Sequence, residues 1–143
     1  MEEFDPAVQS WLGGFLNEAG AVAGTVHRHT DGGLRLSAAI NIPAPVQQVV
    51  EWVPSGKGMA GLALERGEPV QTCNLQEDRS GAVKPGARAV NAQAAVALPV
   101  RDESGAIVAV VGAAFREERA IEGAELERLQ RAAATLAGIA PGR

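Results

Sequence analysis

The stretch VPSGKGMAGLALERGEPVQTCNL, from Val53 to Leu75, places a lysine between two glycines. A loop of this kind can hold phosphates when it reads G-x-x-x-x-G-K-[ST], because backbone amides and the lysine contact the phosphates and the hydroxyl holds magnesium. Here Glu51 stands where the first glycine belongs, and Gly58 stands where the hydroxyl belongs. The stretch therefore does not match a phosphate-binding loop.

The same glycines match the dinucleotide pattern G-x-G-x-x-G at Gly56, Gly58 and Gly61. That pattern acts when it follows a buried parallel strand. Trp52 and Pro54 argue against such a strand, since proline cannot donate to a central ladder. The isolated pattern is weak support for a dinucleotide site.

Two histidines, His27 and His29, are spaced by two and share one face of an expected strand. A metal site would need further ligands, and no nearby cysteine or acidic cluster supplies them, so we predict no metal. Because Arg28 and Thr30 make this strand end polar, we expect both histidines to face solvent or a rim. A hydrogen bond to a ligand, or an axial role, remains the alternative.

The single cysteine, Cys73, excludes an internal disulfide and fits a reducing compartment. A free cysteine in a strand is most often a small buried hydrophobe. A redox sensor would require an exposed thiol with a lowered pKa. No serine lies in a nucleophile elbow, so we predict no catalytic residue and no cofactor.

Composition limits the possible partners. The chain has 143 residues, 46% hydrophobic and 21% charged, which is typical of a soluble globular protein with a core. The net charge is -4 and the arginines are scattered, so we do not expect nucleic acid as a partner. The chain has no long apolar run, and its start, MEEFDPAVQ, is acidic. We expect no membrane contact and a cytoplasmic location.

Periodicity and turn residues indicate the elements. Apolar spacing predicts a helix over 4–19, and Asp31-Gly32 predicts a hairpin between two strands. Pro45 suits the first turn of a short helix. A second short helix is expected from Lys57 to Glu65, and Gly67 ends it. A strand over 69–75 and a long polar connection over 76–92 follow.

Two further strands, QAAVALPV and AIVAVVGAAF, are joined by RDESG and are apolar on both faces, so they should be central. Pro99 requires a bulge or an unpaired edge. A helix over 121–139 completes the chain. We therefore predict one domain over 1–143 with a core at 21–116: an α+β sandwich, with an antiparallel sheet of about five to six strands and helices on both faces.

This order, together with particular motifs, resembles the GAF domain family. The motifs are the Pro and Gly-x-Gly-x-x-Gly before a helix, the Gly-Glu-Pro turn, the closing hairpin ALPVRDESGAIVAVVGAAF and the terminal helix IEGAELERLQRAAATLA. The resemblance covers roughly Phe4 to Ile139. It implies that Gly56 and Gly58 form a turn and that Gly61 allows close packing of the helix.

The resemblance also implies a small-molecule pocket. Its residues here would be Ile40, Asn41, Met59, Ala60, Val90, Asn91 and Ala114. Members that bind cyclic nucleotides carry Asn-Lys and Phe-Asp-Glu motifs, whereas this chain has Phe115-Arg116-Glu117 and Ile121-Glu122-Gly123. We do not expect a cyclic nucleotide.

Enzymatic members of the family, the free methionine sulfoxide reductases, use cysteines at the helix entrance and before the closing hairpin. This chain has Met59-Ala60 and AVKPGARAV there, and Cys73 has no second thiol to resolve a sulfenic acid. Members that bind bilins stack them among aromatics, which make up only 3% of this chain. We predict no enzyme, with a thiol redox protein as a remote alternative.

The terminal helices carry apolar residues at heptad spacing, which could cover the sheet, pair with a second protomer, or do both. These are Leu12, Phe15, Leu126, Leu129 and Leu136. In sensory members of the family such helices commonly form a dimer, so we expect a homodimer. Because Arg143 ends the chain, we expect an unidentified small molecule to act through a separate signalling protein. A protein-interaction adaptor with a closed pocket is the alternative.

Overall fold

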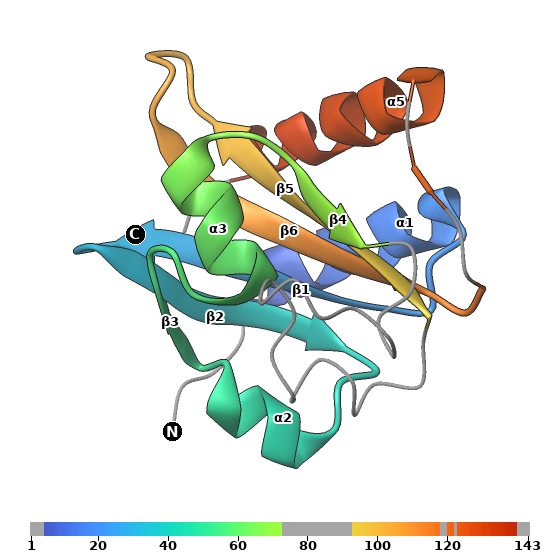
Figure 1. The fold of residues 1–143 in the computed structure, drawn as a ribbon, viewed down its shortest axis with the longest axis horizontal. Coiled ribbons are helices and arrows are strands. Elements are labelled where there is room, and N and C mark those ends of the chain that lie inside the picture. The colour runs from blue at the N-terminus through green and yellow to red at the C-terminus, as the bar shows by residue number, and fades with distance from the viewer. Residues whose placement is uncertain (1–4, 73–92, 118–119, 122, 140–143) are drawn as a thin grey trace.

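The computed structural model describes residues 5–72, 93–117, 120–121 and 123–139. Its strands form one antiparallel sheet of six, in the order β3-β2-β1-β6-β5-β4, with helices against both faces (Figure 1). This confirms the predicted α+β fold class. The strands are β1 (Ala23–Thr30), β2 (Gly33–Ile40), β3 (Trp52–Pro54), β4 (Val70–Thr72), β5 (Ala94–Arg101) and β6 (Ile107–Phe115).

A tight hairpin joins β1 and β2 at the predicted Asp31-Gly32 turn. Both residues have positive φ, 26° and 82°, which matches the right-handed twist of the flanking strands. The register then shifts, because His27 pairs with Leu36 while Val26 pairs with Ala38. Ser37 is left unpaired, which is a β-bulge.

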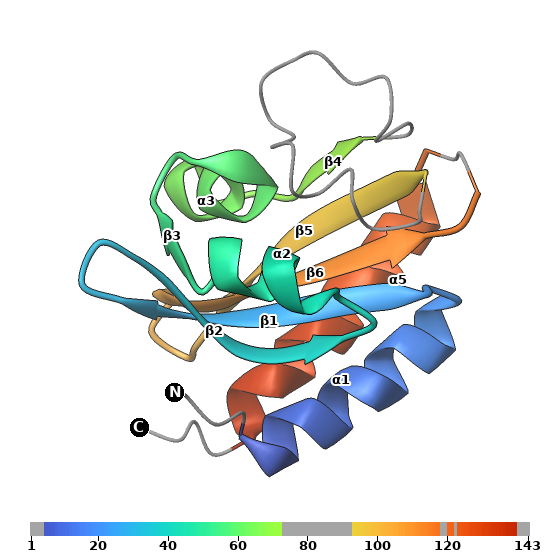
Figure 2. The same ribbon diagram turned by 90° about the horizontal axis from the view of Figure 1, so that it is seen from below.

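One face of the sheet, here called the helix face, is covered by the two terminal helices (Figure 2). They are α1 (Pro6–Ala19) and α5 (Gly123–Ala134), and the short 3₁₀ helix η1 (Thr135–Gly138) continues α5. Asp5 caps α1, since its side chain accepts from the backbone amides of Ala7 and Val8. The first helix thus begins at Pro6, two residues later than predicted.

The helix face holds the larger core. Of the five residues predicted to pair two protomers, Leu12, Phe15, Leu129 and Leu136 are buried within the single chain, and Leu126 packs against them. Covering the sheet thus accounts for the apolar spacing of these helices. Homodimer formation stays a prediction.

The opposite face, here called the pocket face, carries α2 (Ala44–Val49) and α3 (Gly58–Arg66). Pro45 lies in the first turn of α2 and Gly67 ends α3 with φ 72°, both as predicted. A Cβ added at Gly61 would lie 2.5 Å from the carbonyl oxygen of Pro54, so only glycine allows α3 to approach β3 this closely. The three-residue strand β3 was not predicted.

The closing hairpin of β5 and β6 follows the prediction. β6 is central, and β5 lies between β6 and the short edge strand β4. Strand β4 pairs only with Ala95 to Ala97, and a bulge follows Val100. Pro99 therefore lies beyond the reach of β4 and beside an irregularity, which accommodates its missing amide.

Candidate ligand pocket

A cavity of about 180 Å³ lies between the pocket face and the segment that carries α2, β3 and the start of α3. Its floor comes from the alternate residues of two neighbouring strands. Ala95 and Ala97 of β5 lie opposite Ala114 and Gly112 of β6 in the ladder. Cross-strand neighbours on one face are in contact, so the small side chains form a shallow, flat floor.

The walls of the cavity are mostly aliphatic. The contributors are Val46 of α2, Val50 at the C-terminal end of α2, Val53 of β3, and Met59 and Ala60 of α3. Lys57 also lines the cavity, and its side chain is exposed. An apolar hollow with few polar groups is typical of a small-molecule site.

His27 is the buried polar residue of this site. It is 3% exposed, and its Nε2 donates a hydrogen bond to the carbonyl oxygen of Val50, 2.8 Å away, at the end of α2. Burial lowers the pKa of His27 because it penalises the charged form, and the hydrogen bond to Val50 offsets only part of this effect. The imidazole is therefore neutral at neutral pH, with its proton on Nε2.

The second ring nitrogen of His27 is then an acceptor. No hydrogen bond from a described residue reaches Nδ1. Every fully buried side-chain nitrogen or oxygen among the described residues has a partner, so Nδ1 is not completely enclosed, and His27 lines the cavity. An acceptor in an apolar hollow can orient a ligand that carries a donor.

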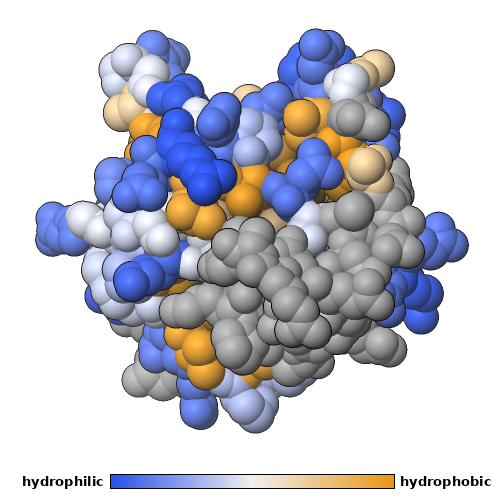
Figure 3. Space-filling view, viewed as in Figure 1, coloured by the Kyte–Doolittle hydropathy of each residue, from blue (hydrophilic) through white to orange (hydrophobic). Residues whose placement is uncertain are grey.

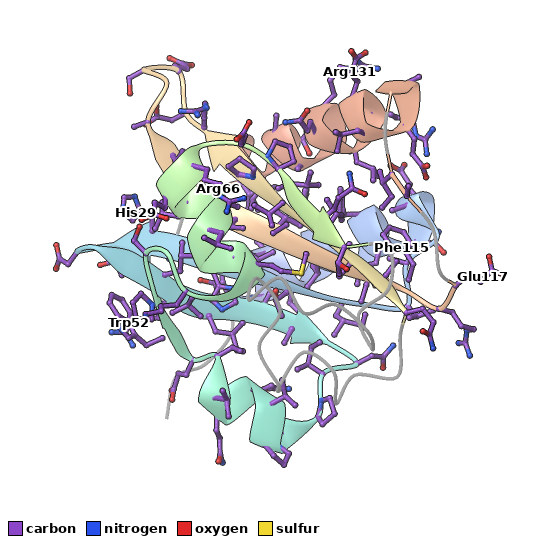
Figure 4. All side chains as sticks on the ribbon, in the orientation of Figure 1. His29, Trp52, Arg66, Phe115, Glu117 and Arg131 are labelled. Atoms are coloured by element: carbon purple, nitrogen blue, oxygen red, sulfur yellow. The ribbon has the colours of Figure 1, made fainter. Side chains whose placement is uncertain are left out.

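The prediction that both histidines face solvent or a rim is confirmed for His29 and wrong for His27. His29 is exposed at the hairpin end of β1, and its Nδ1 lies 2.9 Å from the carbonyl oxygen of Ile107 (Figure 4). His27 is buried because α2 and β3 fold over it. The segment that covers His27 comes from later in the chain.

Three of the seven predicted pocket residues line the cavity together: Met59, Ala60 and Ala114. Val90 and Asn91 lie outside the described residues.

Ile40 and Asn41 are corrections, because neither lines the cavity. The bulge at Ser37 turns Ile40 to the helix face, where a Cβ on Gly13 of α1 would lie 3.7 Å from its Cδ1. Asn41 has φ 58°, is exposed, and donates from Nδ2 to the carbonyl oxygen of Val22. Ile42, one residue further, lines the cavity instead.

The residues that sequence reasoning missed are the rest of the floor (Ala95, Ala97 and Gly112), His27 and the aliphatic residues of α2. The floor had a signal in the sequence, since Ala95 and Ala97, and Gly112 and Ala114, are small residues at a spacing of two in apolar strands. The contribution of Val46 and Val50 depends on how α2 folds back, which no local pattern indicates.

A second hollow, of about 470 Å³, lies on the helix face at the hairpin end of the sheet. Arg28, His29 and Asp102 border it, together with Ile139, the last described residue. Its lining is more polar than that of the first cavity. The cavity on the pocket face is therefore the better candidate site.

Exposed apolar side chains also distinguish the segment over the pocket. Val49 of α2 is 62% exposed and Trp52 of β3 is 41% exposed, the two large exposed hydrophobics among the described residues. Figure 3 shows apolar surface over α2, and Figure 4 shows Trp52 at the outer edge of the sheet. The guanidinium of Arg35 lies 5.8 Å from the centre of the Trp52 ring, a cation–π distance.

The part of the chain that the structure describes holds neither a metal-binding cluster nor a membrane-spanning helix. No three histidine, cysteine or acidic residues are grouped to hold a metal ion. No described helix has both the length and the apolar character needed to cross a bilayer.

The fold is a small α+β domain with one antiparallel sheet between two layers of helices and a cavity on the pocket face. The family model of the GAF domain matches residues 8–140, so the chain belongs to the GAF domain family. Comparison with curated protein sequences gave no match.

Several solved structures share the fold at low sequence identity. A type II free methionine-R-sulfoxide reductase from Thermoplasma acidophilum is 16% identical with a TM-score of 0.73, over 93% of this chain and 89% of that one. The GAF domain of A. aeolicus nlh2, in an inactive state, is 18% identical with a TM-score of 0.67, over 96% and 82%. The GAF domain/HD domain protein of Geobacter sulfurreducens is 12% identical with a TM-score of 0.72, over 92% and 88%.

Proposed function

We propose that this chain is a non-enzymatic regulatory module that senses a small molecule in the cavity on the pocket face and passes the signal to a separate protein. The carrying observation is the apolar cavity of about 180 Å³ with one buried acceptor, Nδ1 of His27, at its surface. Similar structures include a GAF domain/HD domain protein and a domain of a two-component sensor histidine kinase, which supports a regulatory role.

The composition of the site supports a binding role over a catalytic one. Its described lining contains no cysteine, serine or carboxylate. Some similar structures are free methionine-R-sulfoxide reductases, so thiol chemistry is the alternative to exclude. A sulfenic acid needs a second thiol to resolve it within the chain, and Cys73, which lies outside the described residues, is the only cysteine.

Native mass spectrometry of the purified protein tests the proposal. Ala60→Trp places a large ring in the cavity wall, whereas Ala134→Trp places the same ring on the exposed side of α5 as a matched control. We expect extra mass on the wild type and on Ala134→Trp, and none on Ala60→Trp. Protomers at the mass of the sequence alone in all three samples would favour an adaptor instead.

The adaptor is the second candidate, favoured by the exposed Val49 and Trp52. In this function the α2–β3 segment would contact a protein without a small molecule in the cavity. Ala60→Trp would leave such an interaction intact, whereas Val49→Asp would weaken it.

Three narrower proposals accompany the main one. The homodimer is tested by light scattering, and a monomer at tens of micromolar would contradict it. The redox alternative is tested by Cys73→Ser, where unchanged behaviour under peroxide would remove it. A cytoplasmic location is proposed from the single cysteine.

A further inference from the structure

The volume of the cavity matches about one ring. A cavity of about 150 Å³ lined by aliphatic and aromatic side chains holds benzene. At about 180 Å³, this cavity takes a six-membered ring with roughly one or two further heavy atoms. Linear or branched aliphatics of the same volume would lose more rotational freedom on binding than a rigid ring does.

The shape of the floor favours a planar ligand. Ala95, Ala97, Gly112 and Ala114 project little from the pleated backbone, so a flat ring can lie against the sheet. Met59, on the wall, adds a polarisable thioether, and sulfur makes favourable contacts with aromatic rings. Both features select an aromatic ring over a bulky saturated one.

The polar groups at the cavity define what the ring must carry. Nδ1 of His27 is an acceptor without a partner among the described residues, and the hydroxyl of Thr25 lies on the same strand face two residues away. A ligand that occupies the cavity without a donor would leave Nδ1 desolvated, which is unfavourable. Lys57, the one cation in the described lining, is exposed, so a buried carboxylate would have no buried counter-charge.

We infer that the cavity binds an uncharged, single-ring aromatic molecule whose hydroxyl or amino group donates a hydrogen bond to Nδ1 of His27. The inference rests on the proposed function, since it names the class of molecule that this same cavity would sense. It makes His27 the residue that determines specificity and the small floor residues the determinants of size.

The probes are phenol, toluene and benzoate. Their binding is measured by the amide chemical shifts of the ¹⁵N-labelled protein. Toluene matches phenol in size without a donor, and benzoate adds a negative charge. We expect saturable shifts with phenol at Gly112 and Ala114, and roughly tenfold weaker binding of toluene, the size of one net hydrogen bond. Benzoate is expected to bind more weakly still.

His27→Leu removes the acceptor, and His29→Leu is the matched control on the exposed histidine of the same strand. Phenol should bind His27→Leu about tenfold more weakly, at the level of toluene, while His29→Leu behaves as the wild type does. Equal binding of phenol and toluene to the wild type would overturn the role of His27.

A direct measurement covers the case in which His27→Leu does not fold. The ¹⁵N signal of Nδ1 in the wild type should move when phenol, but not toluene, is added; an unmoved signal at saturation would overturn the inference. Absence of saturable phenol binding would also overturn the ligand class. The proposed function would survive that result if native mass spectra showed a bound molecule of another kind.

Discussion

The two faces of the sheet differ although the same strands form them. Toward the helix face, β5 and β6 present Leu98, Val111 and Phe115, which are at most 1% exposed and complete a closed core with α1 and α5. Toward the pocket face, Val110 is buried under α3, whereas Ala95, Ala97, Gly112 and Ala114 are small and a cavity remains over them. Side-chain size at these four positions thus distinguishes the cavity from the packed parts of the sheet.

The largest expected effect comes from truncating the helix face. Leu98→Ala should lower the free energy of unfolding by about 2–5 kcal/mol, because it leaves a void in a closed core. Met59→Ala, at the half-buried wall of the cavity, should cost less than about 1.5 kcal/mol. Urea unfolding measures both, and equal losses would contradict the difference between the faces.

Enlarging a small residue should destabilise the protein more on the helix face than on the pocket face. Ala94→Leu adds volume to the closed helix face, where Ala94 is 0% exposed, and should destabilise by about 1–3 kcal/mol. Ala114→Val fills cavity space and should change stability by less than about 0.5 kcal/mol while weakening phenol binding. Thermal unfolding and the phenol titration check this pair; a strongly destabilised Ala114→Val would show that the floor is packed.

Acidification should weaken the pocket face through His27. Its pKa is lowered in the folded state from 6.5, so the unfolded chain takes up a proton first. The free energy of unfolding should therefore fall as the pH drops through 6.5 toward the lower folded pKa. His27→Gln should remove most of this dependence and His29→Gln should not. Urea titrations at several pH values between about 7.5 and 5.5 measure this pH dependence of the free energy of unfolding.

The smallest expected effect concerns the exposed segment over the pocket. Val49→Asp should alter the free energy of unfolding by less than about 0.5 kcal/mol, because the side chain is 62% exposed. It should still reduce any self-association that uses α2, which light scattering at increasing concentration would detect. A large loss of stability would mean that Val49 is packed in solution.

Local signals were sufficient for much of the fold. Asp31-Gly32, Pro45 and Gly67 each specify their own backbone geometry, so the hairpin, the start of α2 and the end of α3 were predictable. The apolar spacing of the terminal helices also predicted a buried stripe. Whether that stripe packs on the sheet or on a second chain depends on tertiary packing. Within this single chain it packs on the sheet.

The site was less predictable because its geometry depends on distant partners. Ile40 was assigned to the pocket from the family resemblance, but the unpaired Ser37 reverses which face later residues of β2 occupy. His27 looked exposed beside Arg28 and Thr30, yet its burial follows from Val50, 23 residues later in the chain. Strand β3 is too short, at three residues, to produce a periodic signal.

The bond between His27 and Val50 makes the imidazole a relay between the cavity and α2. Hydrogen bonds in a chain polarise one another, so a proton donated to Nδ1 from inside the cavity makes the N–H at Nε2 a stronger donor to the carbonyl at the end of α2. A ligand in the cavity would then change how tightly α2 and the adjoining Trp52 pack against the rest of the sheet. On the proposed function, α2 could respond to a ligand without a large rearrangement of the fold.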